Sequence, residues 1–143
     1  MKVLSFFSRN FGLLKRVPPF PLALDGALLL WTFLTRSEVL DWLDYIRDEV
    51  EKWPDISITM HRFGGLEFRK GGKEIGHIHS NGVLDLPLPK AIREEVLRTG
   101  TAVPHHTFPL GNMVSLVLRK SADRETARTL NLLKLSCDAR EKI

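Results

Sequence analysis

Five histidines are the residues best suited to chemistry in this chain of 143 residues, and all of them lie between positions 61 and 106. Imidazole titrates near neutral pH, so histidine can act as a general base, a general acid or a metal ligand. His77 and His79 are two residues apart, His105 and His106 are adjacent, and His61 ends an alternating segment. If the fold brings these rings together, the predicted site is an apolar pocket with convergent imidazoles.

Three glycine-bearing pairs predict how the histidines are arranged. Residues 56–61 alternate between apolar and polar side chains, which is typical of a strand. The pairs Gly64-Gly65, Gly71-Gly72 and Asn81-Gly82 follow, and each suits a two-residue hairpin turn because such turns need positive backbone angles. The predicted result is a meander of four antiparallel strands.

Two-residue turns also predict the register, since residues directly opposite one another share a face of a sheet. In this register His61 is opposite Phe68, and His77 is opposite Leu86. One face would then carry His61, His77 and His79 among Phe63, Leu66, Phe68, Ile75, Leu84 and Leu86. The other face would carry Glu67, Arg69, Glu74 and Asp85. A slip of one residue in any turn would invert the strand beyond it.

Helices are expected beside this meander. Apolar residues recur at helical spacing over residues 37–53 and again over 121–137, while Pro89 and Gly100 bracket a shorter helix. Residues 113–118 predict a further strand. The order predicts one α+β domain over residues 36–143, an antiparallel meander with helices packed on one side.

Composition favours a soluble chain in a reducing, cytoplasmic compartment. The hydrophobic content is 43% and the charged content is 27%, both ordinary for a globular protein. The single cysteine, Cys137, cannot form an internal disulfide. Residues 1–36 hold five basic residues against one acidic residue, which accounts for the net charge of +4 and leaves the rest neutral. We therefore expect no nucleic-acid partner, since such a partner requires a basic surface on the folded domain.

Residues 1–35 form a separate basic, apolar segment. Apolar residues recur at helical spacing over residues 4–14, with basic side chains elsewhere around the turn, as in an amphipathic helix. After three prolines, Leu22 to Leu34 gives an apolar run of 13 residues, shorter than the roughly 20 residues of a membrane-spanning helix. Two interpretations stay open: a helix packed on the core, or a peripheral membrane contact through residues 1–34.

A metal site is an open alternative for the histidines. His77 and His79 could both reach one ion, but one strand separates them from His61 by a backbone distance of about 10 Å. His105 or His106 would have to close the site from a loop. We predict no metal ion and no cofactor, and keep a histidine-ligated metal protein as an alternative.

Several motifs together resemble the luciferase-domain family, which is named for fungal luciferase. They are Lys73 to His79 (KEIGHIH), Leu84-Asp85-Leu86, a helix ending in glycine, His105-His106 near a proline, and a closing strand and helix over about residues 56–140. Fungal luciferase is a membrane-associated protein that oxidises a hydroxylated pyrone with molecular oxygen and uses no metal or organic cofactor. The resemblance implies an oxygenase-like enzyme with His77, His79 and, from the loop, His106 as site residues.

The expected reaction starts with one imidazole removing an enol proton, while a second, cationic imidazole stabilises the developing peroxide. The expected catalytic residues are His77, His79 and His106. The expected substrate-binding residues are His61, Phe68, Leu84, Leu86 and His105. The partners would be molecular oxygen and a small hydrophobic, enolisable aromatic or pyrone-like molecule. The alternative is a membrane-peripheral module that binds a ligand or a protein without chemistry.

Overall fold

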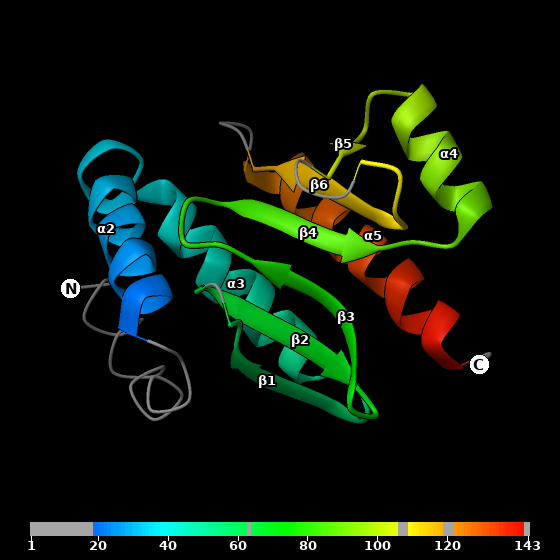
Figure 1. Ribbon diagram of the computed structural model, residues 1–143, viewed down its shortest axis with the longest axis horizontal. Coiled ribbons are helices and arrows are strands. Elements are labelled where there is room, and N and C mark those ends of the chain that lie inside the picture. The colour runs from blue at the N-terminus through cyan, green and yellow to red at the C-terminus, as the bar shows by residue number, and fades with distance from the viewer. Residues whose placement is uncertain (1–18, 63, 106–108, 119–121, 142–143) are drawn as a thin grey trace.

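The computed structural model describes residues 19–62, 64–105, 109–118 and 122–141. Within these residues the chain forms one antiparallel sheet of six strands with helices beside it (Figure 1). This confirms the predicted α+β class. The helix predicted near residues 4–14, and the residues Phe63 and His106, lie outside the described part of the chain.

The predicted meander forms the larger part of the sheet. Its strands are β1 (Ile56–Met60), β2 (Leu66–Lys70), β3 (Lys73–Ile78) and β4 (Val83–Pro87). The strand β6 (Met113–Val117) pairs with β4, and the short β5 (Val103–Pro104) pairs with β6, which gives the order β1-β2-β3-β4-β6-β5. The sequence predicted a loop where β5 lies.

Two of the four helices within the described residues cover one face of this sheet. The helices are α2 (Pro19–Thr35), α3 (Glu38–Glu51), α4 (Lys90–Arg98) and α5 (Ala122–Glu141). α3 and α5 lie on the same side of the sheet, and α2 lies beside α3 at one end (Figure 1). No helix in the described ranges combines enough length with enough apolar character to cross a bilayer.

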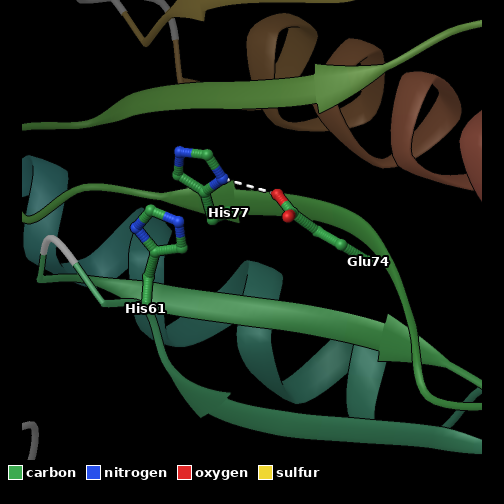
Figure 2. A group of neighbouring side chains, drawn as sticks. All are labelled: His61, Glu74 and His77. Atoms are coloured by element: carbon green, nitrogen blue, oxygen red, sulfur yellow. Dashed lines mark hydrogen bonds and ion pairs between the residues drawn. The ribbon is translucent and has the colours of Figure 1, made fainter. Parts of the chain in front are cut away.

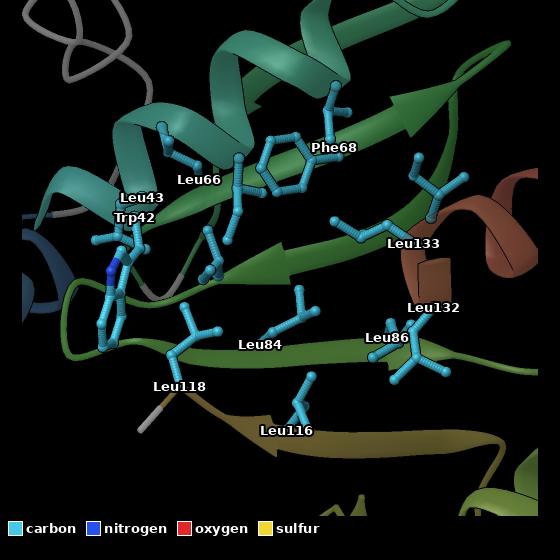
Figure 3. Close-up of a cluster of buried hydrophobic side chains, with 14 of the residues drawn as sticks. Trp42, Leu43, Leu66, Phe68, Leu84, Leu86, Leu116, Leu118, Leu132 and Leu133 are labelled. Atoms are coloured by element: carbon cyan, nitrogen blue, oxygen red, sulfur yellow. The ribbon is translucent and has the colours of Figure 1, made fainter. Parts of the chain in front are cut away.

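The hydrophobic core lies between the sheet and the helices α3 and α5 (Figure 3). Phe68, Leu84 and Leu86 are fully buried there, with Leu43 from α3 and Leu133 from α5. Burying one such side chain contributes about 1.5–3 kcal/mol. The prediction that Phe68, Leu84 and Leu86 share a face with the histidines is therefore wrong, because they point to the helix side of the sheet.

The first reason for this error is the loop between β1 and β2. Phe68 is opposite Ile58, not opposite His61. His61 is instead opposite Gly65, since the amide of His61 donates to the carbonyl of Gly65 at 3.1 Å. The loop is thus longer than the two residues predicted, and His61 lies on the face away from the helices.

The second reason is a β-bulge between β2 and β3. The predicted pair of Arg69 with Glu74 is present, but the register then shifts so that Glu67 is opposite His77. One extra residue in β3 takes up the shift. In a regular strand, residues three apart point to opposite faces. Here the bulge brings Glu74 and His77 to the same face.

The third reason is the turn between β3 and β4. The amide of His79 donates to the carbonyl of Val83 at 2.8 Å, and Gly82 donates back to the carbonyl of His79 at 2.9 Å. This gives a loop of three residues with Gly82 at a φ of 84°, where glycine is favoured. Asp85, and not Leu86, is therefore opposite His77. The longer loop puts Asp85 on the histidine face.

Candidate functional site

Three imidazoles converge on the sheet face that points away from α3 and α5. Figure 2 shows two of them, His61 and His77, in front of the strands with the helices behind. The rings of His61 and His77 are stacked, with centroids 3.8 Å apart and an interplanar angle of 4°. The ring of His79 stands at 88° to His77, with centroids 5.1 Å apart. The predicted convergence of His61, His77 and His79 is thus confirmed, although His61 comes from a strand two places away.

A glycine on the intervening strand explains how His61 reaches across. Gly65 is opposite His61 and presses against β3, where an added Cβ would lie 2.2 Å from the carbonyl oxygen of Ile78 and 2.9 Å from the Cα of His79. No side chain of this residue therefore stands between the first and third strands. The ring of His61 crosses this gap and stacks on His77.

Carboxylates flank the imidazoles, contrary to the prediction that they occupy the other face. His77 donates from Nδ1 to Glu74 Oε1 at 2.6 Å, as the dashed line in Figure 2 shows. Asp85 is fully buried and accepts a hydrogen bond from the hydroxyl of Ser115 at its Oδ1. Glu67 is also buried and bonds Arg69 at 2.9 Å. The face is therefore polar and charged, not apolar.

The second carboxylate oxygen of Asp85 is the point at which three histidines meet. The Nε2 atoms of His77 and His79 each lie 3.4 Å from Asp85 Oδ2, and that of His105 lies 3.6 Å away. Pairing of Val103 with Ser115 brings the loop that carries His105 to this position. Oδ2 itself is buried and accepts no hydrogen bond, since normal N–H···O bonds are about 2.7–3.2 Å long.

The environments of His61 and His77 drive their pKa values apart. Burial lowers the pKa of His77, but its contacts with Asp85 and Glu74 outweigh burial and raise that pKa to about 9. Burial and the neighbouring charge of His77 lower the pKa of His61 to about 4. At neutral pH the stacked pair thus consists of a protonated ring, His77, and a neutral ring, His61. Such a divided pair is typical of acid–base sites.

The carboxylates respond in a matching way. Burial would raise the pKa of Asp85, but its contacts with His77, His79 and Ser115 hold it below its usual range. Burial would raise the pKa of Glu74, but its hydrogen bond to His77 and the charges of neighbouring basic side chains together lower it. Burial and the charge of Glu74 raise the pKa of Glu67. Two of the three carboxylates are thus stabilised as anions beside the imidazoles.

Two groups among the described residues have the donor types of a metal site. The ligand atoms of His77, His79 and Asp85 lie within 4.8 Å of one another, and so do those of His61, Glu74 and His77. In the second group the two nearest atoms are only 2.6 Å apart and share a hydrogen bond. The first group has its atoms spaced more widely around Asp85 Oδ2.

A cavity near the domain's helices lies away from these histidines. It has a volume of about 600 Å³ and is lined by Pro87, Leu88, Pro89, Ile92, Leu135 and Arg140, among others. These residues come from the end of β4, from the two residues that follow it, and from α4 and α5. The cavity and the histidine cluster are therefore separate features.

Searches of curated proteins and of solved structures found no match to the chain. A family model described as Luciferase domain matches residues 72–135, which is less than half of the chain. The match runs from the turn before β3 into α5, so it contains Glu74, His77, His79, Asp85 and His105 but not His61. This match confirms the resemblance seen in the sequence: residues 72–135 are similar to the Luciferase domain family.

Proposed function

We propose that the chain is an oxidoreductase that deprotonates a small, enolisable aromatic or pyrone-like compound at the histidine cluster so that it reacts with molecular oxygen. The observation that carries this proposal is the stack of His61 on His77 at 3.8 Å. Two positively charged rings repel each other at this separation. Because His77 has Glu74 and Asp85 at its two nitrogens, positive charge is favoured there and His61 is left neutral.

The neutral ring of His61 is accordingly the proton acceptor, and the negative charge of the enolate that forms in the same step offsets the repulsion between the two protonated rings. It takes the acidic proton of the substrate, and the electron pair of the broken bond stays on the substrate as an enolate. The enolate gives two electrons to molecular oxygen, which forms the carbon–oxygen bond and is reduced to a peroxide. Positive charge at His77 stabilises both anions in a site from which water is largely excluded. This assigns the base to His61, which the sequence had suggested only as a substrate-binding residue.

The proposal is tested with His61→Gln in a panel of hydroxylated pyrones and phenols. Oxygen uptake is followed with an electrode, and exchange of the acidic substrate proton for deuterium is followed by NMR. Loss of a general base lowers such rates by about 10²–10⁴-fold. Glu95→Gln on the exposed surface of α4 is the matched control. Wild-type rates of uptake and exchange in the His61→Gln variant, with an unchanged circular dichroism spectrum, would refute the assignment.

A second function, binding to an anionic membrane surface, is favoured by α2. The side of this helix against the domain buries Asp25 and Thr32 together with Leu29. Its outer side carries Leu30, Trp31 and Leu34, which are 60–69% exposed. Asp25 accepts a hydrogen bond from Ser80 at 2.9 Å, so the inner side is fixed to the domain. An apolar outer face of this kind is suited to the headgroup boundary of a bilayer.

The net positive charge of residues 1–36, which include α2, complements the negative charge of such a surface. Residues 1–36 hold five basic residues against one acidic residue, and each basic residue near an anionic leaflet contributes about 1 kcal/mol. We expect the chain to sediment with phosphatidylserine vesicles and less with phosphatidylcholine vesicles. Trp31→Glu should abolish sedimentation, whereas Leu110→Glu, at a position that is 98% exposed elsewhere, should not. Equal binding by both variants, or a dimer that Trp31→Glu dissociates, would exclude the membrane contact.

A further inference from the structure

Asp85 Oδ2 is a buried carboxylate oxygen with positive or protonatable groups around it and no hydrogen bond of its own. The Nε2 atoms of His77 and His79 lie 3.4 Å from it, and that of His105 lies 3.6 Å from it. An unsatisfied carboxylate oxygen in a site without solvent access costs several kilocalories per mole unless a charge compensates it. The surroundings of Oδ2 therefore suit a cation.

The remaining atoms of these side chains are already held by other residues. Glu74 binds Nδ1 of His77 at 2.6 Å, and Ser115 donates to Oδ1 of Asp85. Of the polar side-chain atoms of His77 and Asp85, Nε2 and Oδ2 are thus the two that face the space between His77, His79 and Asp85. A carboxylate on the far nitrogen of a histidine is the usual way in which proteins orient a metal-binding imidazole.

The distances between these atoms agree with coordination better than with hydrogen bonding. Ligands bound at about 2.0–2.2 Å in a tetrahedral site are about 3.3–3.6 Å apart. The separations of Asp85 Oδ2 from the two Nε2 atoms are 3.4 Å. The other group, His61, Glu74 and His77, does not meet this criterion, because Nδ1 and Oε1 approach to 2.6 Å.

We propose that His77 Nε2, His79 Nε2 and Asp85 Oδ2 bind one divalent transition-metal ion. His105 lies beside Oδ2, where it closes one side of the ion or supplies a fourth ligand. Two imidazoles and one carboxylate leave open positions on the ion, as in metal sites that bind water or oxygen. The ion would occupy the place of the proton on His77, so that positive charge remains beside His61. The proposal goes beyond the proposed function and does not depend on it.

The pattern of the chain supports this choice over a structural ion pair. His77 in β3 and His79 directly after it are two residues apart, so both rings lie on one face. The bulge and the three-residue turn bring Glu74 and Asp85 to that face. An ion pair alone would need one histidine for each carboxylate. Here three imidazoles approach a single carboxylate oxygen. One charged imidazole would be enough to pair with that carboxylate, so the other two need a different explanation.

The test uses the full chain after treatment with a chelator and dialysis. Co²⁺ is added as the probe, since its visible absorption reports coordination geometry, and Zn²⁺ binding is measured by calorimetry and by elemental analysis. We expect one equivalent of metal per chain, a visible Co²⁺ spectrum typical of four to five ligands, and a higher melting temperature with Zn²⁺. Less than about one tenth of an equivalent in the wild-type chain would overturn the proposal.

Variants distinguish this site from adventitious binding. His79→Gln removes a ligand that is partly exposed, and it should weaken Zn²⁺ binding by more than about 100-fold, as should Asp85→Asn. Glu74→Gln, which changes only the group behind His77, should weaken binding by about 10–100-fold. His61→Gln should keep the metal, because His61 supplies no ligand. Wild-type affinity in His79→Gln would overturn the site.

The same variants separate failure of the metal site from failure of the proposed function. If the wild-type chain binds no metal but loses oxygen uptake in His61→Gln, the metal site is refuted and the proton transfer is supported. If metal binds as expected but His61→Gln has wild-type rates of uptake and exchange, the metal site is supported and the assignment of His61 as the general base is refuted.

Discussion

Asp85 lies directly opposite His77 in the pairing of β3 with β4, and its Oδ2 lies 3.4 Å from Nε2 of that histidine. The pair is buried on a face of the sheet that α3 and α5 do not cover, and Glu74 binds the other nitrogen of the same ring. His77 is therefore held between two carboxylates. The chemistry of the site depends on how this ring is charged and oriented.

Replacement of Glu74 by glutamine should lower the pKa of His77, because one of its two carboxylate partners loses its charge. The free energy of unfolding should fall by roughly 1–3 kcal/mol, the usual effect of removing a charged partner from a buried hydrogen bond. NMR titration of the His77 ring and urea unfolding measure the two effects. Glu94→Gln, on the exposed surface of α4, should change neither. An unchanged titration of His77 in Glu74→Gln would contradict this account.

The free energy of unfolding of the metal-free chain should depend on pH on both sides of about pH 6.5. The folded-state pKa of His77 is raised to about 9, so its contribution is complete below 6.5 and is lost as the pH rises through 9. The folded-state pKa of His61 is lowered to about 4, so stability also falls as the pH decreases from 6.5 towards 4. Urea unfolding across this range measures both slopes.

His61→Gln provides the control for the acidic slope. This variant should flatten the decrease between about pH 6.5 and the range where carboxylates begin to titrate, and it should leave the decrease on the alkaline side. If both slopes persist unchanged in His61→Gln, the acidic slope does not arise from this ring.

Alanine at Gly65 should destabilise the chain much more than alanine at Gly71. Both glycines have positive φ, 81° and 53°, so each substitution carries the backbone cost of about 1 kcal/mol. Only at Gly65 would the new Cβ lie 2.2 Å from the carbonyl oxygen of Ile78, while nothing lies within 4 Å at Gly71. Urea unfolding should give an additional loss of about 2 kcal/mol or more for Gly65→Ala. Equal losses would mean that β2 and β3 can separate without cost.

Leu86→Ala should lower the free energy of unfolding by about 2–5 kcal/mol, since a cavity would form in a fully buried core. Leu110→Ala, at a residue that is 98% exposed, should change it by no more than about 0.5 kcal/mol. Neither variant should change the NMR titration of His77, because Leu86 lies on the opposite face of the sheet. A shifted titration of His77 in Leu86→Ala would show that Leu86 does contribute to the site.

The order of the elements could be predicted from the sequence, but the faces of the strands could not. Alternation in residues 56–60 and helical spacing in residues 38–51 reflect burial, and burial determined which elements form. Glycine pairs marked the hairpins correctly. They did not reveal the number of residues in each loop, and with a repeat of two residues an error of one changes the face.

The residues assigned to the site were partly wrong for the same reason. The spacing of His77 and His79 was enough to place them together, and His61 joined them as expected. Asp85 was assigned to the other face because a two-residue turn was assumed where the loop contains Ser80, Asn81 and Gly82. One signal in the sequence pointed the other way: an apolar face that carries Leu84 and Leu86 has to be buried against the helices, as it is in the structure, which leaves Asp85 and the polar histidines for the other face.

The extra residue in β3 links the spacing of Glu74 and His77 to the presence of the bulge. With the bulge, side chains three residues apart share a face. Without it, regular alternation lets two side chains share a face only when they are two or four residues apart. Loss of one residue between Glu74 and His77 would therefore remove the bulge and still keep the carboxylate beside the ring. Among homologous chains that keep this glutamate and this histidine, a spacing of three residues should indicate a bulged strand and a spacing of two a regular one.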